Sequence, residues 1–221
     1  MEIQPIATFH SPFPTKFGIP KQSGLVQELQ GEVVFELAFR NVDSLRGMEE
    51  FDYIWLIWEF SANKHGANSP VVRPPVLGGN ERMGVFATRS PYRPNPLGLS
   101  VVKIDRIEWE SPRGPIIHVL GADLMDGTPI YDIKPYLPYA DAHPEARGGF
   151  TDRRSWPRLT VHLSSSVASL FDDDERAALS QTLALDPRPH YHDNPNKVYG
   201  MLFDGHDIHF RVEGKDLFVI D

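Results

Sequence analysis

Short apolar runs, separated by segments rich in proline and glycine, follow one another along most of the chain. Runs of this length, with many β-branched and aromatic residues, indicate strands rather than helices. Their spacing, with turn residues between them, is typical of an antiparallel barrel or a sandwich. We expect strands at residues 3–9, 32–39, 51–60, 83–87, 99–109, 115–120, 130–136, 159–163, 198–203, 208–212 and 217–220.

Three of these runs carry more specific expectations. Residues 51–60 (FDYIWLIWEF) are the most apolar stretch, which predicts a central strand buried on both faces. A helix is the alternative there, but the content of Ile and aromatic residues favours a strand. Residues 3–9 contain a proline and are expected at an edge of the sheet. The run at residues 83–87 predicts a further buried strand.

Helical signals are few. A helix is predicted over residues 167–185, where apolar residues fall on one helical face. A short helix is expected over residues 41–48, capped by Asn41 or Asp43. The apolar residues of the longer helix are Ala168, Phe171, Ala178 and Leu183.

Loops rich in proline and glycine divide the chain. The loop at residues 138–157 marks the expected domain boundary, with a larger domain over residues 1–150 and a smaller α+β domain over residues 151–221. Residues 61–80 form a second loop that is too long for a simple hairpin, which suggests a functional role.

Composition narrows the class of protein. With 41% hydrophobic and 24% charged residues, the 221-residue chain reads as a soluble globular protein. It has no cysteine, which excludes disulfides and thiolate metal sites. The first residues lack a basic, apolar leader and no run is long enough for a membrane span, so a cytoplasmic location is expected.

The net charge of −8 argues against a protein that binds nucleic acid through its overall field. The charges are distributed unevenly, however. Residues 64–106 hold seven basic and two acidic residues, whereas residues 165–221 hold five basic and eleven acidic ones. The basic middle can therefore bind RNA locally, with the acidic surface held away.

The first chemical motif is a loop between two apolar runs. Arg89, Arg93 and Asn95 lie among three prolines, which restrict the backbone and remove donors. A rigid loop that presents guanidinium groups suggests a binding surface for an anion or a carboxylate. The alternative is a proline-rich corner whose arginines simply face water.

The second motif contains a tight turn followed by alternating polar residues. Asp126-Gly127 is a strong turn signal, because glycine supplies positive φ. Asp132, Lys134 and Tyr136 follow with a two-residue period and would project from one face of a strand. The alternatives are a hairpin with a solvated polar face and a structural Asp132–Lys134 ion pair.

Histidines near the C-terminus are candidate metal ligands. Asp186-Pro187-Arg188-Pro189 makes the region of His190 and His192 a loop, and we expect no metal site. No motif for acyl transfer, nucleotide hydrolysis or Rossmann-type binding is present. The candidate ligands are His190, His192, Asp193, His206 and His209.

Several long strings of this sequence resemble the TrmO (TsaA-like) family of tRNA adenosine N6-methyltransferases, over residues 6–212. They are SPFPTKFGIPKQSGL, RPPVLGGN, GVFATRSPYRPNPLGLSVVKI and DLMDGTPIYDIKPYLPYAD, together with Asp186-Pro187-Arg188-Pro189 and Tyr199-Gly200. The resemblance implies a mainly β fold, with an antiparallel β-barrel N-terminal domain and a smaller α+β C-terminal domain. It also implies a homodimeric enzyme that uses S-adenosylmethionine to methylate N6 of threonylcarbamoyladenosine 37, beside the tRNA anticodon.

The resemblance implies a site for the donor, and we assign roles at the acceptor from the polar residues of the two motifs. Arg93 and Asn95 are expected to bind the substrate, and Asp132, Lys134 and Tyr136 to act in catalysis without a metal. Asp132 and Tyr136 would orient the acceptor amine or accept its proton, while Lys134 and Arg93 would hold a carboxylate or a phosphate. The residues expected to hold S-adenosylmethionine are Gln22, Ser23, Gly24, Leu25, Ser61, Ala62, Arg89, Leu99, Asp123, Leu124, Asp126, Gly127 and Thr128.

One departure from the family and two other functions remain at this point. Many members have histidine where this chain has Ser61, so a role for that imidazole is not carried over. A barrel that binds S-adenosylmethionine or RNA without catalysis is one alternative function. A methyltransferase for small molecules is the other.

Overall fold

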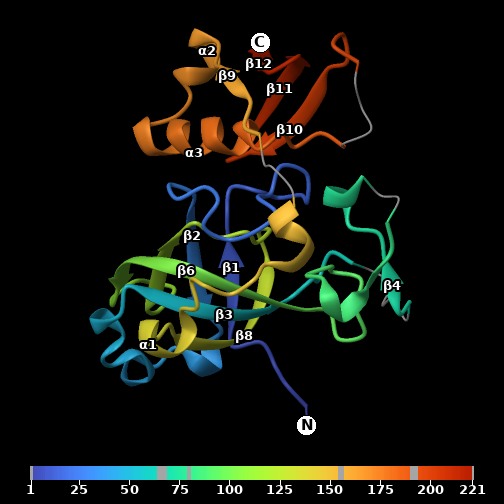
Figure 1. Cartoon of the computed structure of the whole chain (residues 1–221). Helices are drawn as coiled ribbons and strands as arrows, with labels where there is room; N and C mark the ends of the chain where they lie inside the picture. Colours follow the sequence, from blue (N-terminus) through green and yellow to red (C-terminus); the bar gives the residue numbers. More distant parts are fainter. Residues whose placement is uncertain (1, 64–68, 79–80, 154–156, 190–193, 221) are drawn as a thin grey trace.

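A computed structural model describes residues 2–63, 69–78, 81–153, 157–189 and 194–220. A closed barrel forms the lower part of the molecule, and a second, smaller sheet with a helix covers one end of it (Figure 1). The fold is mainly β, with a smaller α+β part at the C-terminus, which confirms the predicted fold class. Around the barrel the order is β1 (Ala7–His10), β2 (Gln30–Phe35), β7 (Ile116–Leu120), β6 (Leu97–Glu108), β3 (Tyr53–Glu59) and β8 (Thr128–Pro135).

Alternating side chains build the interior of the barrel. On β3, Ile54, Leu56 and Trp58 point inward and are buried, while Tyr53 and Trp55 lie on the outer face. The prediction of a strand buried on both faces is therefore wrong. Tyr and Trp carry polar atoms and tolerate a half-exposed position, so a run rich in them need not be covered on both sides.

Closure of the barrel corrects a second prediction. The N-terminal strand β1 was expected at an edge, yet it pairs with β2 on one side and β8 on the other. A barrel has no free edge, and Pro5 lies before the strand, where it removes no ladder hydrogen bond. Strand β6 pairs with β3 along its first half and with β7 along its second, with an irregular register between Ile104 and Arg106.

The C-terminal part, which we call the cap, is a four-stranded sheet in the order β10-β11-β12-β9, with β9 parallel to β12. The predicted helix over residues 167–185 is interrupted, and Asp172 caps the longer piece through a capping box with Glu175. The elements are β9 (Thr160–His162), α2 (Ser165–Ala168), α3 (Asp173–Ala184), β10 (Tyr199–Phe203), β11 (His206–Glu213) and β12 (Asp216–Ile220).

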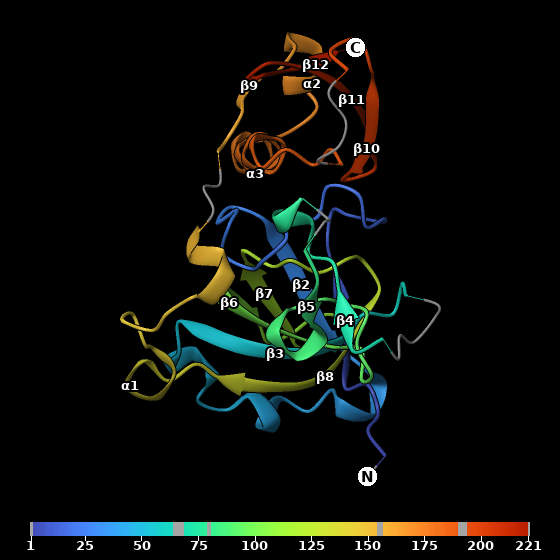
Figure 2. The same cartoon turned by 45° about the vertical axis from the view of Figure 1, so that its right-hand side comes forward.

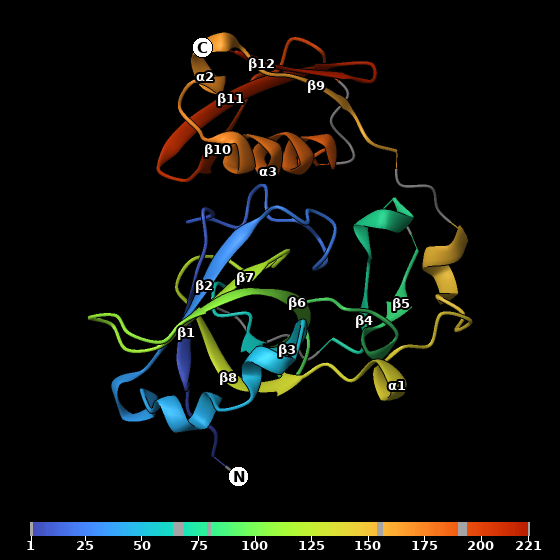
Figure 3. The ribbon, with the colours of Figure 1, turned by 90° about the vertical axis from the view of Figure 1, so that its left-hand side faces the viewer.

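The cap shares its hydrophobic core with residues 11–29, which we call the first loop. Phe13, Val26 and Leu29 of this loop are buried in the same cluster as the inner faces of α3 and the cap sheet. Figures 2 and 3 show the loop between the top of the barrel and α3. A backbone hydrogen bond from Asp204 to Pro12 adds to this contact. The first loop is therefore held between the cap on one side and the barrel on the other.

The segment between β3 and β6 differs most from expectation. The run at residues 83–87 is not a buried strand: a two-residue strand β5 (Met83–Gly84) pairs with β4 (Val71–Val72), and a 3-10 helix follows at Val85–Ala87. Only Val85 is buried there, whereas Phe86 is exposed. The Thr88 hydroxyl donates to the Val85 carbonyl and closes this turn locally.

Other short helices lie in the connections. The predicted helix over residues 41–48 is a 3-10 helix at Val42–Leu45, with the Asn41 side chain as its cap. The expected loop at residues 138–157 contains α1 (Pro138–Asp141) and a 3-10 helix at Gly149–Arg153. Further 3-10 helices occupy Leu37–Phe39, Met48–Glu50 and Pro75–Leu77. Within the described ranges, no helix has the length and apolarity needed to cross a membrane.

Candidate functional site

Three groups of loops meet at the end of the barrel beneath the cap. They are the first loop, the connection between β3 and β6, and residues 121–127, which link β7 to β8. Because β7 and β8 are not neighbours in the barrel, residues 121–127 must cross its end, and Ala122 and Leu124 plug it. We call this end the mouth. All of the residues expected to hold S-adenosylmethionine belong to these loops, except Leu99 and Thr128, which lie on the adjoining strands.

The first loop contacts each of the others. Its Gly24 N–H donates to the carbonyl of Gly121 at 2.8 Å. Arg89 donates to the side chain of Gln22, and Lys16 donates to that of Asn63. Segments far apart in sequence are thus brought together at the mouth, as the predicted set of residues requires.

Asp123 lies at the centre of this junction. Trp58 donates to the Ser100 hydroxyl at 3.0 Å, and that hydroxyl donates to Asp123 Oδ1 at 2.5 Å. Burial raises the pKa of the Asp123 carboxyl, while the bond from Ser100 and the charge of Arg89 oppose the rise. The mouth therefore holds a poorly solvated carboxyl group, whose charged form a nearby cation would stabilise.

Gly98 is required beside this network. A Cβ atom on it would lie 2.3 Å from the Trp58 ring, so no other residue leaves the indole in place. The sequence pattern did not reveal Trp58, Ser100 or Lys16 as part of the site. Ser100 offered a partial signal, because it is a polar residue within the apolar run that begins at Leu99.

The other predicted residues of the segment 123–128 are not part of the hydrogen-bond network around Asp123. Leu124 and Thr128 are buried, and Thr128 donates to the carbonyl of Met125, so both side chains serve the fold. Asp126 Oδ1 lies 3.0 Å from His10 Nδ1 and accepts a hydrogen bond from the Ser11 N–H. Gly127 has φ of +74°, which confirms the glycine-dependent turn at Asp126-Gly127.

The predicted residues of the β3–β6 connection and of the start of β6 lie on different surfaces. Ser61 is exposed and Ala62 half-buried at the mouth. Leu99 is 56% exposed on the outer wall of the barrel, because it neighbours the inward-pointing Ser100. Arg93 folds back onto its own loop and donates to the carbonyl of Thr88 at 3.1 Å, and Asn95 is exposed beside it.

Asp132, Lys134 and Tyr136 share the outer wall of the barrel rather than the mouth. Lys134 Nζ lies 2.9 Å from Asp132 Oδ2, so the ion pair considered as an alternative is formed. Tyr136 follows β8 at its far end, where its ring packs 5.8 Å from Trp55. In a single chain, Tyr136 and the Asp126-Gly127 turn lie at opposite ends of β8.

Two further contacts order this wall. Tyr131 donates to Glu59 Oε2 at 2.6 Å, and this hydrogen bond raises the pKa of the phenol to about 12. Tyr131 therefore stays protonated near neutral pH. Asp141 of α1 accepts from the Leu137 N–H and from Trp55 Nε1, which lowers the pKa of Asp141 and holds α1 against the wall.

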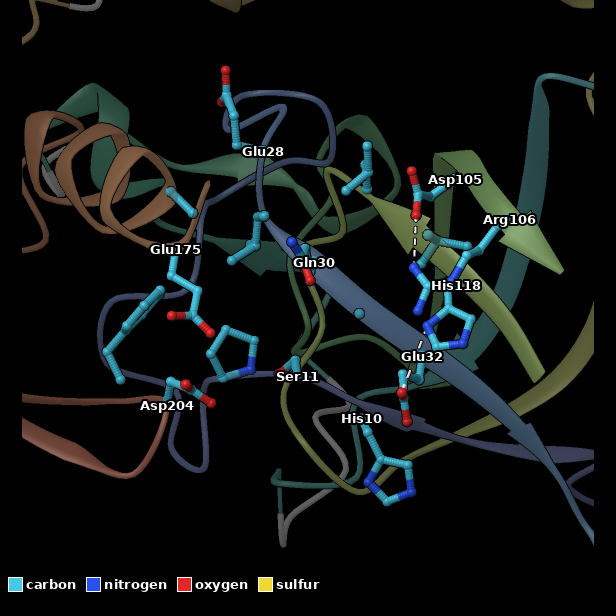
Figure 4. A pocket seen from close by; sticks show the side chains of 17 residues that line it. His10, Ser11, Glu28, Gln30, Glu32, Asp105, Arg106, His118, Glu175 and Asp204 are labelled. Atoms are coloured by element: carbon cyan, nitrogen blue, oxygen red, sulfur yellow. Dashed lines mark hydrogen bonds and ion pairs between the residues drawn. The ribbon is translucent and has the colours of Figure 1, made fainter. Parts of the chain in front are cut away.

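A pocket of about 310 Å³ opens elsewhere, between the side of the barrel and the cap (Figure 4). It contains none of the predicted site residues. Its basic groups are already engaged, since Arg106 pairs with Asp105 and His118 contacts Glu108 and Glu32. This surface does not suit a polyanion. Its acidic lining residues are Glu28, Glu32, Asp105, Glu175 and Asp204.

Comparison with known proteins identifies the family. The N-terminal domain of tRNA-methyltransferase O matches residues 8–142, and the TrmO C-terminal domain matches residues 157–221. The chain belongs to the TrmO family. A tRNA (adenine(37)-N6)-methyltransferase of Escherichia coli K12 is 35% identical over 231 residues, covering 100% of this chain and 97% of the relative.

Two other TrmO-like proteins are similar over nearly the whole length. A Pseudomonas aeruginosa protein, provisionally assigned as the S-adenosylmethionine-dependent methyltransferase RcsF, is 37% identical and covers 97% of this chain and 94% of that protein. The crystal structure of TrmO from Pseudomonas aeruginosa superposes with a TM-score of 0.80 at 32% identity, covering 100% of this chain and 95% of that one. The match therefore includes both the barrel and the cap.

The histidines considered as metal ligands do not gather in the described part of this TrmO-family chain. His190, His192 and Asp193 lie outside the described residues. His209 lies 3.6 Å from Asp207, and His206 packs against Phe171. Among the residues that the structure describes, no three metal-binding side chains are close enough to hold an ion.

Proposed function

We propose that this protein methylates N6 of threonylcarbamoyladenosine 37 in the anticodon loop of tRNA, with S-adenosylmethionine as the donor. Membership of the TrmO family supports methylation of tRNA adenosine 37, because the E. coli relative carries that name. The observation that carries the proposal in this chain is the poorly solvated Asp123 carboxylate at the junction of the mouth loops.

The mouth residues fit the proposed donor. S-adenosylmethionine supplies a methyl group on a positively charged sulfonium, next to an amino acid group and a nucleoside. Asp123 would favour the positive charge. A Cβ atom built on Gly24 would meet no other atom within 4 Å, so the chain leaves open space at this point of the mouth. Arg89 would neutralise a carboxylate on the other side of Asp123.

A homodimer is part of this proposal. The outer wall exposes Tyr53, Leu97 and Leu99, an apolar surface that a second copy would cover. Asp132 lies in the same row of the wall, opposite Ile57 on β3, which in turn pairs with Leu99 on β6. Contact through this wall would bring the Asp132–Lys134 pair of one copy near the mouth of the other, although it lies away from the mouth of its own chain.

We also propose a division of the chain near residue 150, supported by the separate barrel and cap sheets. The shared core of the cap and the first loop means that the two parts fold together. The proposed site of action is the cytoplasm, where tRNA is available.

Analysis of tRNA nucleosides tests the proposal. Threonylcarbamoyladenosine-containing tRNA is incubated with the protein and donor, digested to nucleosides and analysed by mass spectrometry. We expect the modified adenosine to gain one methyl group only when protein and donor are both present. Methylation of another nucleoside, or none, would refute the assigned substrate.

Asp132→Asn tests the proposed proton acceptor. This change keeps the shape of the side chain and removes its charge, and the group is half-exposed, so folding should be little affected. We expect a loss of about a hundredfold in the rate of methyl transfer with donor affinity unchanged. A rate within a few-fold of wild type would show that the Asp132–Lys134 pair is structural.

A further inference from the structure

The loop at residues 84–96, which we call the arm loop, exposes two aromatic rings. Phe86 is 79% exposed and Tyr92 is 53% exposed. Single exposed apolar residues are common on soluble proteins, but two exposed aromatic rings on one short loop are a feature of binding surfaces. Figure 3 shows this segment, with β4 and β5, beside the barrel and below the cap.

The backbone that carries these rings is fixed by its own side chains. Val85 is buried, and its N–H donates to the carbonyl of Pro70 at 2.9 Å. Ser90 N–H donates to the Thr88 hydroxyl, and Tyr92 N–H donates to the Ser90 hydroxyl at 3.2 Å. Rings on a pre-ordered loop lose little conformational freedom when they bind.

Arginines are concentrated in the segments that carry and adjoin the rings. The described residues at 69–78 and 81–96 contain four arginines and one glutamate in a chain of net charge −8. Arg73 and Arg82 are exposed, and neither pairs with an acidic side chain in the ranges that the structure describes. This charge complements a polyanion and contrasts with the acidic pocket at the side of the barrel.

We propose that Phe86 and Tyr92 are stacking platforms for unpaired bases of an RNA loop, with Arg73 and Arg82 contacting the flanking phosphates. Sequence-tolerant stacking of bases on aromatic rings, combined with nearby arginines, is how proteins bind single-stranded RNA. Arg89 ties the arm loop to the mouth, so stacked bases would lie beside the methylation site. The inference rests on the proposed tRNA substrate and assigns how its loop is held.

The test uses the full chain and two RNAs. Affinity is measured with threonylcarbamoyladenosine-containing tRNA in the presence of S-adenosylhomocysteine, and stacking with an anticodon stem-loop that carries 2-aminopurine in its loop. Phe86→Leu and Tyr92→Leu keep apolar bulk and remove the aromatic faces. We expect each to weaken tRNA binding by about fivefold to a hundredfold and to reduce the quenching of 2-aminopurine. Donor affinity should be unchanged.

Charge and stacking are separable in the same assay. Arg82→Gln should lower the slope of log affinity against log salt by about one, whereas the ring variants should leave the slope unchanged. The matched control is Leu37→Ala, because Leu37 is 80% exposed at the other end of the barrel. This control should bind tRNA as wild type does.

Three outcomes would overturn the proposal. Ring variants that bind tRNA within twofold of wild type would do so, as would unchanged quenching of 2-aminopurine. Conversion to monomers in sedimentation, with tRNA affinity per chain retained, would assign the rings to a contact with a second copy. If wild type methylates tRNA while the ring variants bind normally, only the stacking role fails. If wild type neither binds nor methylates tRNA, the proposed function fails.

Discussion

The first loop and the arm loop are similar in composition but differ in burial. Both combine prolines with aromatic and basic residues, and both reach the mouth of the barrel. Phe13 of the first loop is fully buried, whereas Phe86 of the arm loop is 79% exposed. The cap covers one loop and leaves the other open. Proline content thus indicates a rigid backbone in both loops. Whether the aromatic side chains are buried depends on whether the cap packs over the loop.

The two loops also satisfy their polar groups differently. The arm loop satisfies several backbone groups through its own hydroxyls, on Thr88 and Ser90, and one through the carbonyl of Pro70. The first loop depends on other elements, including the carbonyl of Gly121 and the cap residue Asp204. Because the arm loop is ordered largely by its own hydrogen bonds, it can expose its surface to a ligand. The first loop is bonded to other elements and therefore couples the cap to the mouth.

The largest expected difference is in stability. Phe13→Ala should lower the free energy of unfolding by about 3–5 kcal/mol, because it leaves a cavity beside Phe203, whose ring lies 5.4 Å away. Phe86→Ala should change it by less than about 0.5 kcal/mol. Urea unfolding of both variants measures this. Equal losses would mean that the two loops are equally buried in solution.

Asp123→Asn tests the point where both loops meet. The variant can still accept the hydrogen bond from Ser100 but lacks the charge that we propose attracts the donor. We expect donor affinity to fall by about tenfold or more in calorimetry. Affinity equal to wild type would remove Asp123 from the donor site.

The pH dependence of stability sharpens this test. Because burial raises the folded-state pKa of Asp123, the folded protein holds this proton more tightly than the unfolded chain. Stability should therefore fall as pH rises above the ordinary value of 3.8, and Asp123→Asn should lack this contribution. At neutral pH the variant is expected to unfold at a higher urea concentration than wild type. A lower midpoint would contradict the assigned cause.

The smallest effect concerns how the cap holds the first loop. Arg158 donates to the carbonyl of Leu25 at 3.1 Å. Arg158→Ala should weaken donor binding by about two- to fivefold, since one exposed hydrogen bond contributes about 0.5–1 kcal/mol. Arg147→Ala is the control, because Arg147 is also exposed and makes no hydrogen bond or ion pair within the described ranges. Identical donor affinity in both variants would show that the cap does not position Leu25.

Much of the barrel could be predicted from alternation, but not the roles of its faces. Trp55 and Tyr53 made the strand at residues 51–60 look buried on both sides, although they stand on the outer wall beside Tyr136. The run at residues 83–87 looked like a strand because periodicity does not reveal whether a partner strand exists.

The mouth residues were predictable mainly through the family resemblance. Gln22, Arg89 and Asp123 do converge, but nothing in their spacing required it. Leu99 and Ser100 show what sequence lacks: adjacent residues point to opposite sides of a strand, and only the register identifies the inward one. The outward position of Asp132 and Lys134 follows from the same register.

Closure of the barrel between β1 and β8 has a consequence for synthesis. Ala7 pairs with Ile130, so the first strand must wait for most of the barrel sequence before its second ladder can form. Contacts between such distant residues slow folding, because the entropy of closing the loop precedes any gain. On the ribosome, we expect the barrel to close only after β8 has emerged. The cap, whose core needs Phe13 from the beginning of the chain, would then be the last part to fold.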